Sequence, residues 1–250
     1  MIKQAIISAG GFGTRLKPYT DIVPKPMLPI QGHPTLEWAV AQFKKHGVTE
    51  FFFTLHYLPE VVMDYFGDGS KFGVKMNYFV EKEPLGEAGA IKKFESQLDQ
   101  TFYYIYGDIL TLMDYTKMAA AYDEKVTESG GKAIGMERVK KTDSYADADV
   151  VELDERGRFK AMHVKPHTQE YPNAYRTGGS FILDKHIVSY MPEGAAFTLN
   201  KQLIPAAVAA GEDFYAYECS DYSKAFDNLE KWKEVEDYLS KNNIRFEDFS

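Results

Sequence analysis

Short apolar strands alternate with amphipathic helices through the first half of this chain, and this alternation constrains the fold more than any other feature. The predicted strands span residues 2–8, 51–55, 74–80 and 102–106, and the predicted helices span residues 35–46, 59–66, 87–98 and 114–125. Strands separated by helices pair in parallel and are covered on both faces. The pattern therefore predicts an α/β fold around a mostly parallel sheet.

The second half of the chain is richer in strands. Strands are predicted at residues 132–139, 150–153, 159–164, 180–183 and 214–218, with helices at 185–190, 201–210 and 229–239. Residues 154–157, D-E-R-G, are typical of a hairpin turn. Since the sequence has no repeat, low-complexity tract or linker, we expect a single Rossmann-like, three-layer domain with a mixed, mostly parallel sheet and a C-terminal helix.

The opening thirty residues predict a binding site. An apolar strand runs into S-A-G-G-F-G-T-R-L at residues 8–16, and P-K-P-M-L-P-I follows at residues 24–30. Glycines allow positive φ and a close approach of the backbone to a ligand, so successive N–H groups can converge on phosphate oxygens. Arg15 adds a bidentate fork, and the prolines beside Lys25 restrict its ammonium group. These residues predict a cradle for a polyphosphate.

Two better-known phosphate motifs are excluded. The Walker A pattern G-x-x-x-x-G-K-[ST] occurs nowhere, and the dinucleotide pattern G-x-G-x-x-G fails because Leu16 stands in place of its third glycine. A simple turn between a strand and a helix would explain the glycines, but it leaves Arg15 and the P-K-P segment without a role.

The segments G-G-F-G-T-R-L-x-P-x-T and P-K-P-M-L-P-I resemble the signature of the sugar-1-phosphate nucleotidylyltransferases, or NDP-sugar pyrophosphorylases, and most of all their mannose-1-phosphate guanylyltransferase-like branch. The resemblance implies a cytoplasmic transferase of nucleotide sugar and polysaccharide biosynthesis. Such an enzyme couples an NTP to a phosphorylated sugar or sugar-like acceptor and releases pyrophosphate. It also implies a nucleotide-binding half at about 1–126, an acceptor-binding half at about 127–227 and the C-terminal helix at about 228–241.

On the nucleotide side, the resemblance implies three catalytic residues, Arg15, Lys25 and Asp108, and a Mg²⁺ ion held by Asp108 and Asp227. The other nucleotide-binding residues that it implies are Ala9, Gly10, Gly11, Gly13, Thr14, Glu83 and Gly86. Asp108 has the alternative of an ordinary turn aspartate. Asp227 has the alternative of a helix cap, because it stands three residues before Glu230.

Glu83 bears on the choice of base. It lies in E-P-L-G-E-A-G, which resembles the base-reading segment of the family. Its carboxylate can accept both N1–H and N2–H₂ of guanine, whereas uracil offers one N–H group and cytosine an amino group. GTP is therefore favoured, with UTP or CTP as alternatives. The simpler reading of Glu83 is an exposed charge in the run E-K-E.

On the acceptor side, residues 162–166, M-H-V-K-P, resemble the E-K-P segment in which the lysine binds the acceptor's phosphate. Lys165 is retained, but Val164 replaces the glutamate that reaches sugar hydroxyls. Thr177, before Gly178, replaces an asparagine of the family's N-A-G stretch, and Asp149 replaces a glycine. Since polar pairing dominates such choices, the departures predict an acceptor other than an ordinary hexose 1-phosphate.

Composition limits the partners. The net charge of −8 offers no basic stripe for nucleic acid, and no long apolar stretch predicts a membrane span. Cys219 is the single cysteine, which fits a reducing cytoplasm. The expected ligands are an NTP and a phosphorylated small-molecule acceptor, and a homo-oligomer is possible.

Three other functions stay open from the sequence. The departures allow a catalytically silent regulatory subunit that still binds nucleotide. Asp147-Ala148-Asp149 has the D-x-D pattern of metal-dependent glycosyltransferases, and a plain interaction domain would leave the opening motif unexplained. We do not expect zinc at His163 and His167, because Pro166 between them interrupts a helical pair.

Overall fold

The computed structural model describes residues 1–142, 148–167, 169–171, 174–192 and 196–249. The chain divides into two compact units. Unit 1 comprises Met1–Pro84, Ile105–Tyr115 and Asp221–Ser250, and unit 2 comprises Leu85–Tyr104 and Thr116–Ser220. Strand β6 (Thr101–Tyr106) and helix α5 (Tyr115–Glu128) each contribute residues to both units.

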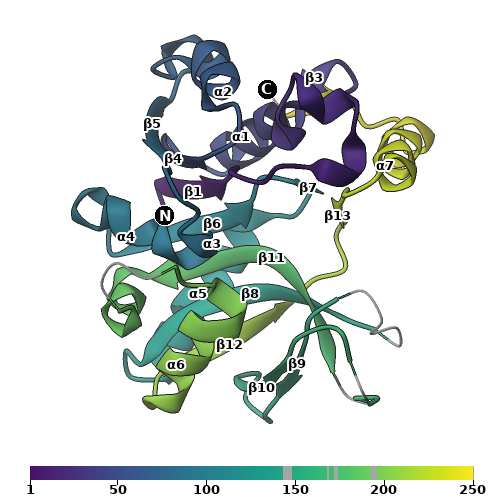
Figure 1. Cartoon of the computed structure of the whole chain (residues 1–250). Coiled ribbons are helices and arrows are strands. Elements are labelled where there is room, and N and C mark those ends of the chain that lie inside the picture. The colour runs from purple at the N-terminus through teal and green to yellow at the C-terminus, as the bar shows by residue number, and fades with distance from the viewer. Residues whose placement is uncertain (143–147, 168, 172–173, 193–195, 250) are drawn as a thin grey trace. The chain divides into compact units, whose positions relative to one another are not determined.

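Unit 1 is built on parallel strands. Strand β4 (Glu50–Leu55) pairs in parallel with β1 (Gln4–Ser8) and with β5 (Lys75–Val80) (Figure 1). The two crossover connections contain α1 (Thr35–Lys45) and α2 (Pro59–Phe66). The centre of β4 is buried without interruption, as expected of a parallel strand that is covered on both faces.

The C-terminal segment of unit 1 returns to the N-terminal part of the chain. Helix α7 (Leu229–Lys241) buries Val235 and Leu239 in a cluster that contains Trp38 and Phe246. These two side chains therefore pack within the chain, whereas Leu229, at the start of the helix, is exposed.

Two short antiparallel ladders complete unit 1. Strand β2 (Pro29–Ile30) pairs with β3 (His33–Pro34). Strand β7 (Ile109–Thr111) pairs with β13 (Ser223–Ala225). The second ladder joins segments that are more than a hundred residues apart in the sequence, and no local signal predicts it.

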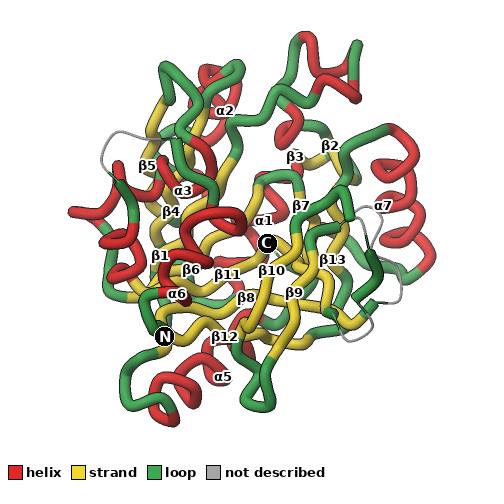
Figure 2. The backbone as a smooth tube through the Cα atoms, turned by 60° about the horizontal axis from the view of Figure 1, so that its bottom comes forward, coloured by secondary structure: helices red, strands yellow, loops and turns green. Residues whose placement is uncertain are grey.

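Unit 2 contains a mixed sheet (Figure 2). Strand β8 (Ala133–Lys141) pairs antiparallel with β11 (Tyr175–Asp184) and parallel with β12 (Asp213–Glu218). Strand β9 (Val150–Leu153) pairs antiparallel with both β10 (Phe159–His163) and β11. The parallel and antiparallel pairs confirm the predicted α/β class with a mixed sheet.

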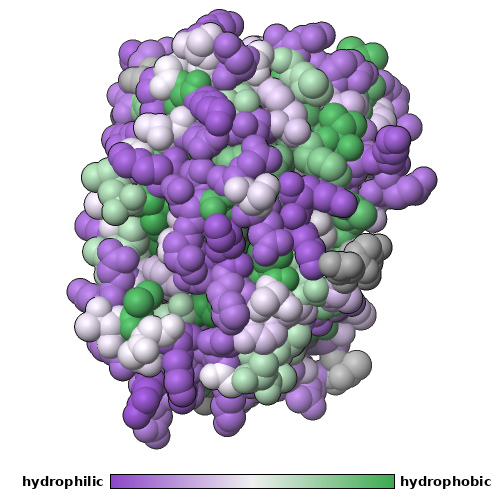
Figure 3. Space-filling view, turned by 90° about the vertical axis from the view of Figure 1, so that its left-hand side faces the viewer, coloured by the Kyte–Doolittle hydropathy of each residue, from purple (hydrophilic) through white to green (hydrophobic). Residues whose placement is uncertain are grey.

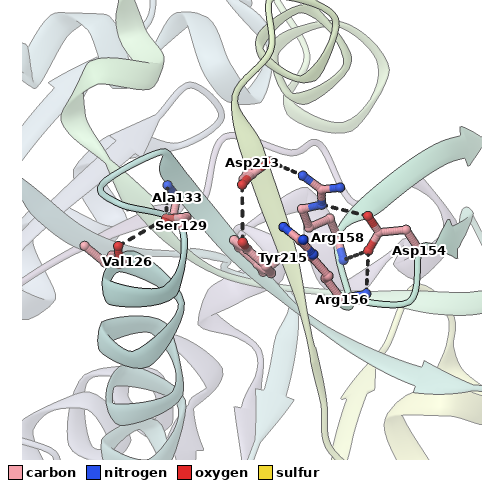
Figure 4. Close-up of polar contacts among 8 residues, drawn as sticks. All are labelled: Val126, Ser129, Ala133, Asp154, Arg156, Arg158, Asp213 and Tyr215. Atoms are coloured by element: carbon pink, nitrogen blue, oxygen red, sulfur yellow. Dashed lines mark hydrogen bonds and ion pairs between the residues drawn. The ribbon is translucent and has the colours of Figure 1, made fainter.

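The predicted hairpin turn connects β9 to β10. Asp154 Oδ1 accepts hydrogen bonds from the backbone N–H groups of Arg156 and Arg158, both at 2.9 Å (Figure 4). The Arg158 guanidinium group donates to Asp154 Oδ2 at 2.7 Å and to Asp213 Oδ1 at 2.8 Å. Because Asp213 begins β12, these ion pairs anchor the hairpin to a neighbouring strand.

Three predicted helices differ in the structure. Residues 87–98 form α3 (Gly86–Gly89), α4 (Ile91–Phe94) and a 3₁₀ turn (Glu95–Gln97), because Gly89 weakens the interior of a longer helix. The helix predicted at 201–210 consists of a π turn (Leu199–Leu203) and α6 (Ile204–Ala209). Pro205 lies in the first turn of α6, where proline is tolerated. The segment Lys185–Tyr190 is a 3₁₀ helix.

The face drawn in Figure 3 is mostly hydrophilic, with apolar residues scattered over it. Within the described ranges, no helix combines the length and the apolar character that crossing a membrane requires.

Candidate active site

The glycine cluster follows β1 and is supported by polar contacts. Gly13 adopts a left-handed φ of +60°, and a Cβ at this position would lie 2.9 Å from Cβ of Lys25. Thr20 donates its hydroxyl to the Gly13 carbonyl at 2.9 Å, and Tyr57 donates its hydroxyl to the Thr20 carbonyl at the same distance. Both the backbone conformation and the close approach to Lys25 therefore require glycine at position 13. The opening motif ends at Thr20, but sequence reasoning assigned it no contact and missed Tyr57, which only the fold brings to this turn.

The rest of the cluster surrounds this turn. Ala9 is buried, and its N–H group donates to the Thr54 carbonyl on β4 at 2.9 Å. Gly11 is exposed and has open space where a side chain would stand, and Thr14 begins a 3₁₀ turn. Gly10 lies between the buried strand end and this exposed part. One end of the cluster is thus fixed to the sheet, and the other is accessible to a ligand.

Lys25 is held almost inside the protein. It begins a 3₁₀ turn that includes Pro26, follows the extended Pro24 and is only 8% exposed. Its Nζ lies 2.5 Å from Asp108 Oδ2 and 5.7 Å from the centre of the Phe226 ring. The carboxylate and the ring face together compensate for the partial burial of the ammonium charge.

Asp108 and Asp227 lie on the two chain segments at one end of the β7–β13 ladder. Ala225 faces Ile109 in register, so Asp108 directly precedes the ladder on one strand and Asp227 closely follows it on the other. The N–H group of Phe226 donates to the Asp108 carbonyl at 3.3 Å. The ladder thus brings two segments that are far apart in the sequence side by side, each with one of the two aspartates.

Asp227 forms ion pairs with two cations, Arg15 and Lys231, and its distance to Lys231 Nζ is 3.0 Å. Partial burial raises the pKa of Asp227, but the hydrogen bond and charge of Lys231 and the charge of Arg15 outweigh it, so the net shift is downward. The carboxyl group is therefore ionised at neutral pH. Only the spacing of four residues between Asp227 and Lys231 could have predicted this ion pair from the sequence.

The helix-cap alternative for Asp227 is wrong. The cap of α7 is Asn228, whose side-chain oxygen accepts a hydrogen bond from the Lys231 N–H group at 2.9 Å. Asn228 has the extended backbone of a capping residue, with φ −152° and ψ 170°. Asp227 stands one residue too early for this role.

Asp108 and Asp227 supply donors of the kind that suits a magnesium ion held jointly with a nucleotide. Mg²⁺ is commonly bound through one or two carboxylates together with substrate phosphates. In the part of the chain that the structure describes, no three His, Cys, Asp or Glu residues form a group that could hold a metal ion without such help. Asp108 and Asp227 already face Lys25 and Arg15, so a metal requires these cations to turn toward another anion.

Glu83 and Gly86 follow β5. Glu83 is exposed in a bend, which matches the simpler reading of an exposed charge and also leaves its carboxylate accessible to a base. Gly86, with φ +70°, is the first residue of α3 and belongs to unit 2.

In unit 2, Asp149 connects the acceptor-side residues. Its Oδ1 accepts a hydrogen bond from the Lys165 N–H group at 3.0 Å. Its carbonyl accepts from the Thr177 N–H group at 3.1 Å and from the Thr177 hydroxyl at 3.2 Å. Val164 immediately precedes Lys165, and Gly178 follows Thr177. Asp149 is thus hydrogen-bonded to both Lys165 and Thr177, and Val164 is the chain neighbour of Lys165.

The two histidines take different partners. His163 Nε2 lies 2.7 Å from Glu152 Oε1, and its ring stacks on Tyr171 at a centroid distance of 3.8 Å. His167 Nε2 lies 2.7 Å from the carbonyl of Ala148. Asp147, the first carboxylate of the D-A-D motif, lies outside the described residues.

The sequence model of the nucleotidyl transferase family matches residues 4–240, and the chain belongs to this family. This result confirms the family that the opening motif predicts. A structure of UDP-glucose pyrophosphorylase complexed with UDP-glucose has the same fold, with a TM-score of 0.80 and 20% identity over 97% of this chain and 100% of that one.

Two curated relatives differ in the base and the sugar that their names state. The UTP–glucose-1-phosphate uridylyltransferase of Synechocystis sp. is 30% identical over 254 residues, which cover 95% of this chain and 64% of that protein. The D-glycero-alpha-D-manno-heptose 1-phosphate guanylyltransferase of Campylobacter jejuni is 37% identical over 151 residues, which cover 60% of this chain and 65% of that protein. The matches span just under two thirds of each relative's length.

Proposed function

We propose that this protein is a sugar-phosphate nucleotidyltransferase. A phosphate oxygen of the acceptor attacks the α-phosphorus of an NTP, the bond to the β-phosphate breaks, and pyrophosphate departs in line. The observation that carries the proposal is the pairing of Arg15 with Asp227 and of Lys25 with Asp108. A phosphate nucleophile is already ionised, so positioning and charge stabilisation are the required contributions.

Each charged residue has a distinct role in this proposal. Lys25 stabilises charge that develops at the α-phosphate, and Arg15 with the N–H groups of the glycine cluster holds the other phosphates. When the two cations turn to the phosphates, Asp108 and Asp227 become available to hold Mg²⁺, which supplies charge neutralisation and alignment. In unit 2, Lys165 holds the acceptor's phosphate.

The choice of substrates belongs to the same proposal. The exposed carboxylate of Glu83 favours GTP, while the uridylyl- and guanylyltransferases among the relatives keep UTP as the main alternative. The connected group around Asp149 supports an acceptor other than an ordinary hexose 1-phosphate, because its polar groups differ from the family pattern.

The test is Mg²⁺-dependent pyrophosphate release by the purified protein. GTP, UTP, CTP, dTTP and ATP are each combined with hexose, heptose and amino-sugar 1-phosphates and polyol phosphates, with Asp108→Asn as the inactive control. Release with one pair, lost in the control, supports nucleotidyl transfer and identifies both substrates. Silence across the panel, with an NTP still raising the melting temperature, favours a nucleotide-binding regulatory subunit. Fast turnover of glucose or mannose 1-phosphate contradicts the proposed acceptor class.

A further inference from the structure

Glu137 is a buried carboxyl group that the proposed reaction does not use. It lies on β8, has no exposed surface, and is in register with the apolar Phe181 of β11 and Ala216 of β12. Its Oε1 accepts hydrogen bonds from the N–H groups of Gly178 and Gly179, at 3.2 and 3.1 Å. A carboxyl group in such surroundings needs a structural or functional reason.

The ladder between β8 and β11 is irregular at this point. Thr177 faces Val139 and Phe181 faces Glu137, so the three residues 178–180 lie opposite the single residue Arg138. Such a bulge takes backbone N–H groups away from their ladder partners. The Glu137 side chain provides the acceptor that two of these groups need. Sequence reasoning limited this strand to 180–183 and so missed the bulge.

Arg138 packs against the same bulge. A Cβ at Gly178 would lie 2.4 Å from Cδ of Arg138 and 2.7 Å from its carbonyl oxygen, so glycine is required. Gly179 has φ +67°, which also favours glycine. Two consecutive residues of β8 therefore determine the backbone path of the segment that follows Thr177.

We propose that Glu137 is a positioning residue, which holds the backbone of Thr177 and Gly178 in the conformation that binds the acceptor. This inference rests on the proposed function. Thr177 is hydrogen-bonded to the Asp149 carbonyl, and the Asp149 carboxylate accepts from the Lys165 N–H group. A shift of the bulge would therefore move Thr177, and through the hydrogen bonds of Asp149 it would also displace Lys165, which binds the acceptor.

The protonation state of Glu137 agrees with this role. Its Oε2 is buried and has no hydrogen-bond partner among the described residues, which suits a neutral acid better than a carboxylate. Burial is the main cause that raises the pKa of Glu137, to about 8. The hydrogen bonds from the N–H groups of Gly179 and Gly178 lower this pKa. The charge of Asp149 raises it further, and that of Arg138 lowers it. The group that supports the bulge is thus uncharged at neutral pH.

The test measures sugar-phosphate and nucleotide binding separately by calorimetry. The probes are the hexose, heptose and amino-sugar 1-phosphates and the polyol phosphates of the pyrophosphate assay, and GTP and UTP. Glu137→Leu removes the hydrogen-bond acceptor, Glu137→Gln keeps an acceptor oxygen without a charge, and Glu155→Gln changes an exposed glutamate of the hairpin as a control.

We expect Glu137→Leu to weaken sugar-phosphate binding on the order of ten- to a hundredfold with nucleotide affinity unchanged, because the loss is one of positioning. Glu137→Gln and Glu155→Gln should bind nearly as the unaltered protein does. Above about pH 8 the unaltered protein should lose sugar-phosphate affinity while Glu137→Gln keeps it, since only the former gains a buried charge.

A folded Glu137→Leu protein with unchanged sugar-phosphate affinity overturns the inference. If that variant does not fold, the comparison of the unaltered protein with Glu137→Gln decides: sugar-phosphate affinities that stay equal from neutral pH to above about pH 8 overturn the inference. An unaltered protein that binds GTP or UTP but none of these phosphorylated acceptors overturns the proposed function, and this inference with it. Normal binding and transfer by both the unaltered protein and Glu137→Leu overturns the inference alone.

Discussion

At the scale of single residues, the Lys25–Asp108 pair depends on unequal burial. The Lys25 side chain is 10% exposed, whereas that of Asp108 is 34% exposed. Exposed ion pairs contribute little to stability, but a buried ammonium group needs its partner. The pair therefore serves chiefly to hold the Lys25 ammonium in one place beside the glycine cluster.

Lys25→Ala should lower turnover by roughly a hundredfold or more, the usual effect of removing a group that stabilises transition-state charge. The matched control is Lys17→Ala, which removes a lysine from an exposed ion pair with Asp21 at 2.9 Å. Pyrophosphate release gives the turnover, and circular dichroism checks the fold. Near-normal turnover of Lys25→Ala would remove this residue from the mechanism.

At the scale of elements, the start of α7 separates two neighbouring residues. Asn228 caps the helix, and Asp227 pairs with Arg15 and Lys231. The spacing of Asp227 and Glu230 resembles a capping box, and only the backbone geometry reveals that the helix begins one residue later. Stability and activity should therefore respond differently at the two positions.

Asn228→Ala should lower the free energy of unfolding by about 1 kcal/mol and leave turnover nearly unchanged, because only a cap is lost. Asp227→Asn should keep the helix but lower turnover and raise the Mg²⁺ concentration needed for half-maximal rate. Urea denaturation and a Mg²⁺ titration of pyrophosphate release measure the two effects. Equal losses of activity in both variants would contradict the division of roles.

At the scale of the whole molecule, Glu137 links folding to pH. The folded chain holds its proton up to about pH 8, whereas an ordinary glutamate releases it near 4.5. Between these values the folded state binds more protons than the unfolded state. The stabilisation is complete below the ordinary pKa and is lost as pH rises toward the folded value.

The melting temperature of the unaltered protein should accordingly fall between about pH 5 and pH 8 relative to that of Glu137→Gln, in which the titrating group is absent. Calorimetric scans of both proteins in matched buffers measure the difference, and other titrating groups cancel in the comparison. Parallel curves would mean that Glu137 is ionised in the folded protein.

Several elements were predictable because their signals are local. Helix α2 runs from Pro59 to Phe66 as predicted, since proline marks its start and Gly67 its end. The centres of β1 and β4 are continuous apolar runs, and the family follows from the opening motif. Helix 87–98 was wrong because glycines and contacts with the Phe197 carbonyl compete with continuous helix.

By itself, the sequence determined the α/β class, the family and the chemical types of the proposed site residues, because each follows from residues close together in the chain. The tertiary structure decided which side chains meet. The β7–β13 ladder places the segment of Asp227 beside that of Asp108, and the bulge in β11 brings Glu137 to the segment after Thr177. Such contacts depend on strand pairing and register between distant segments, and local patterns carry no information about either.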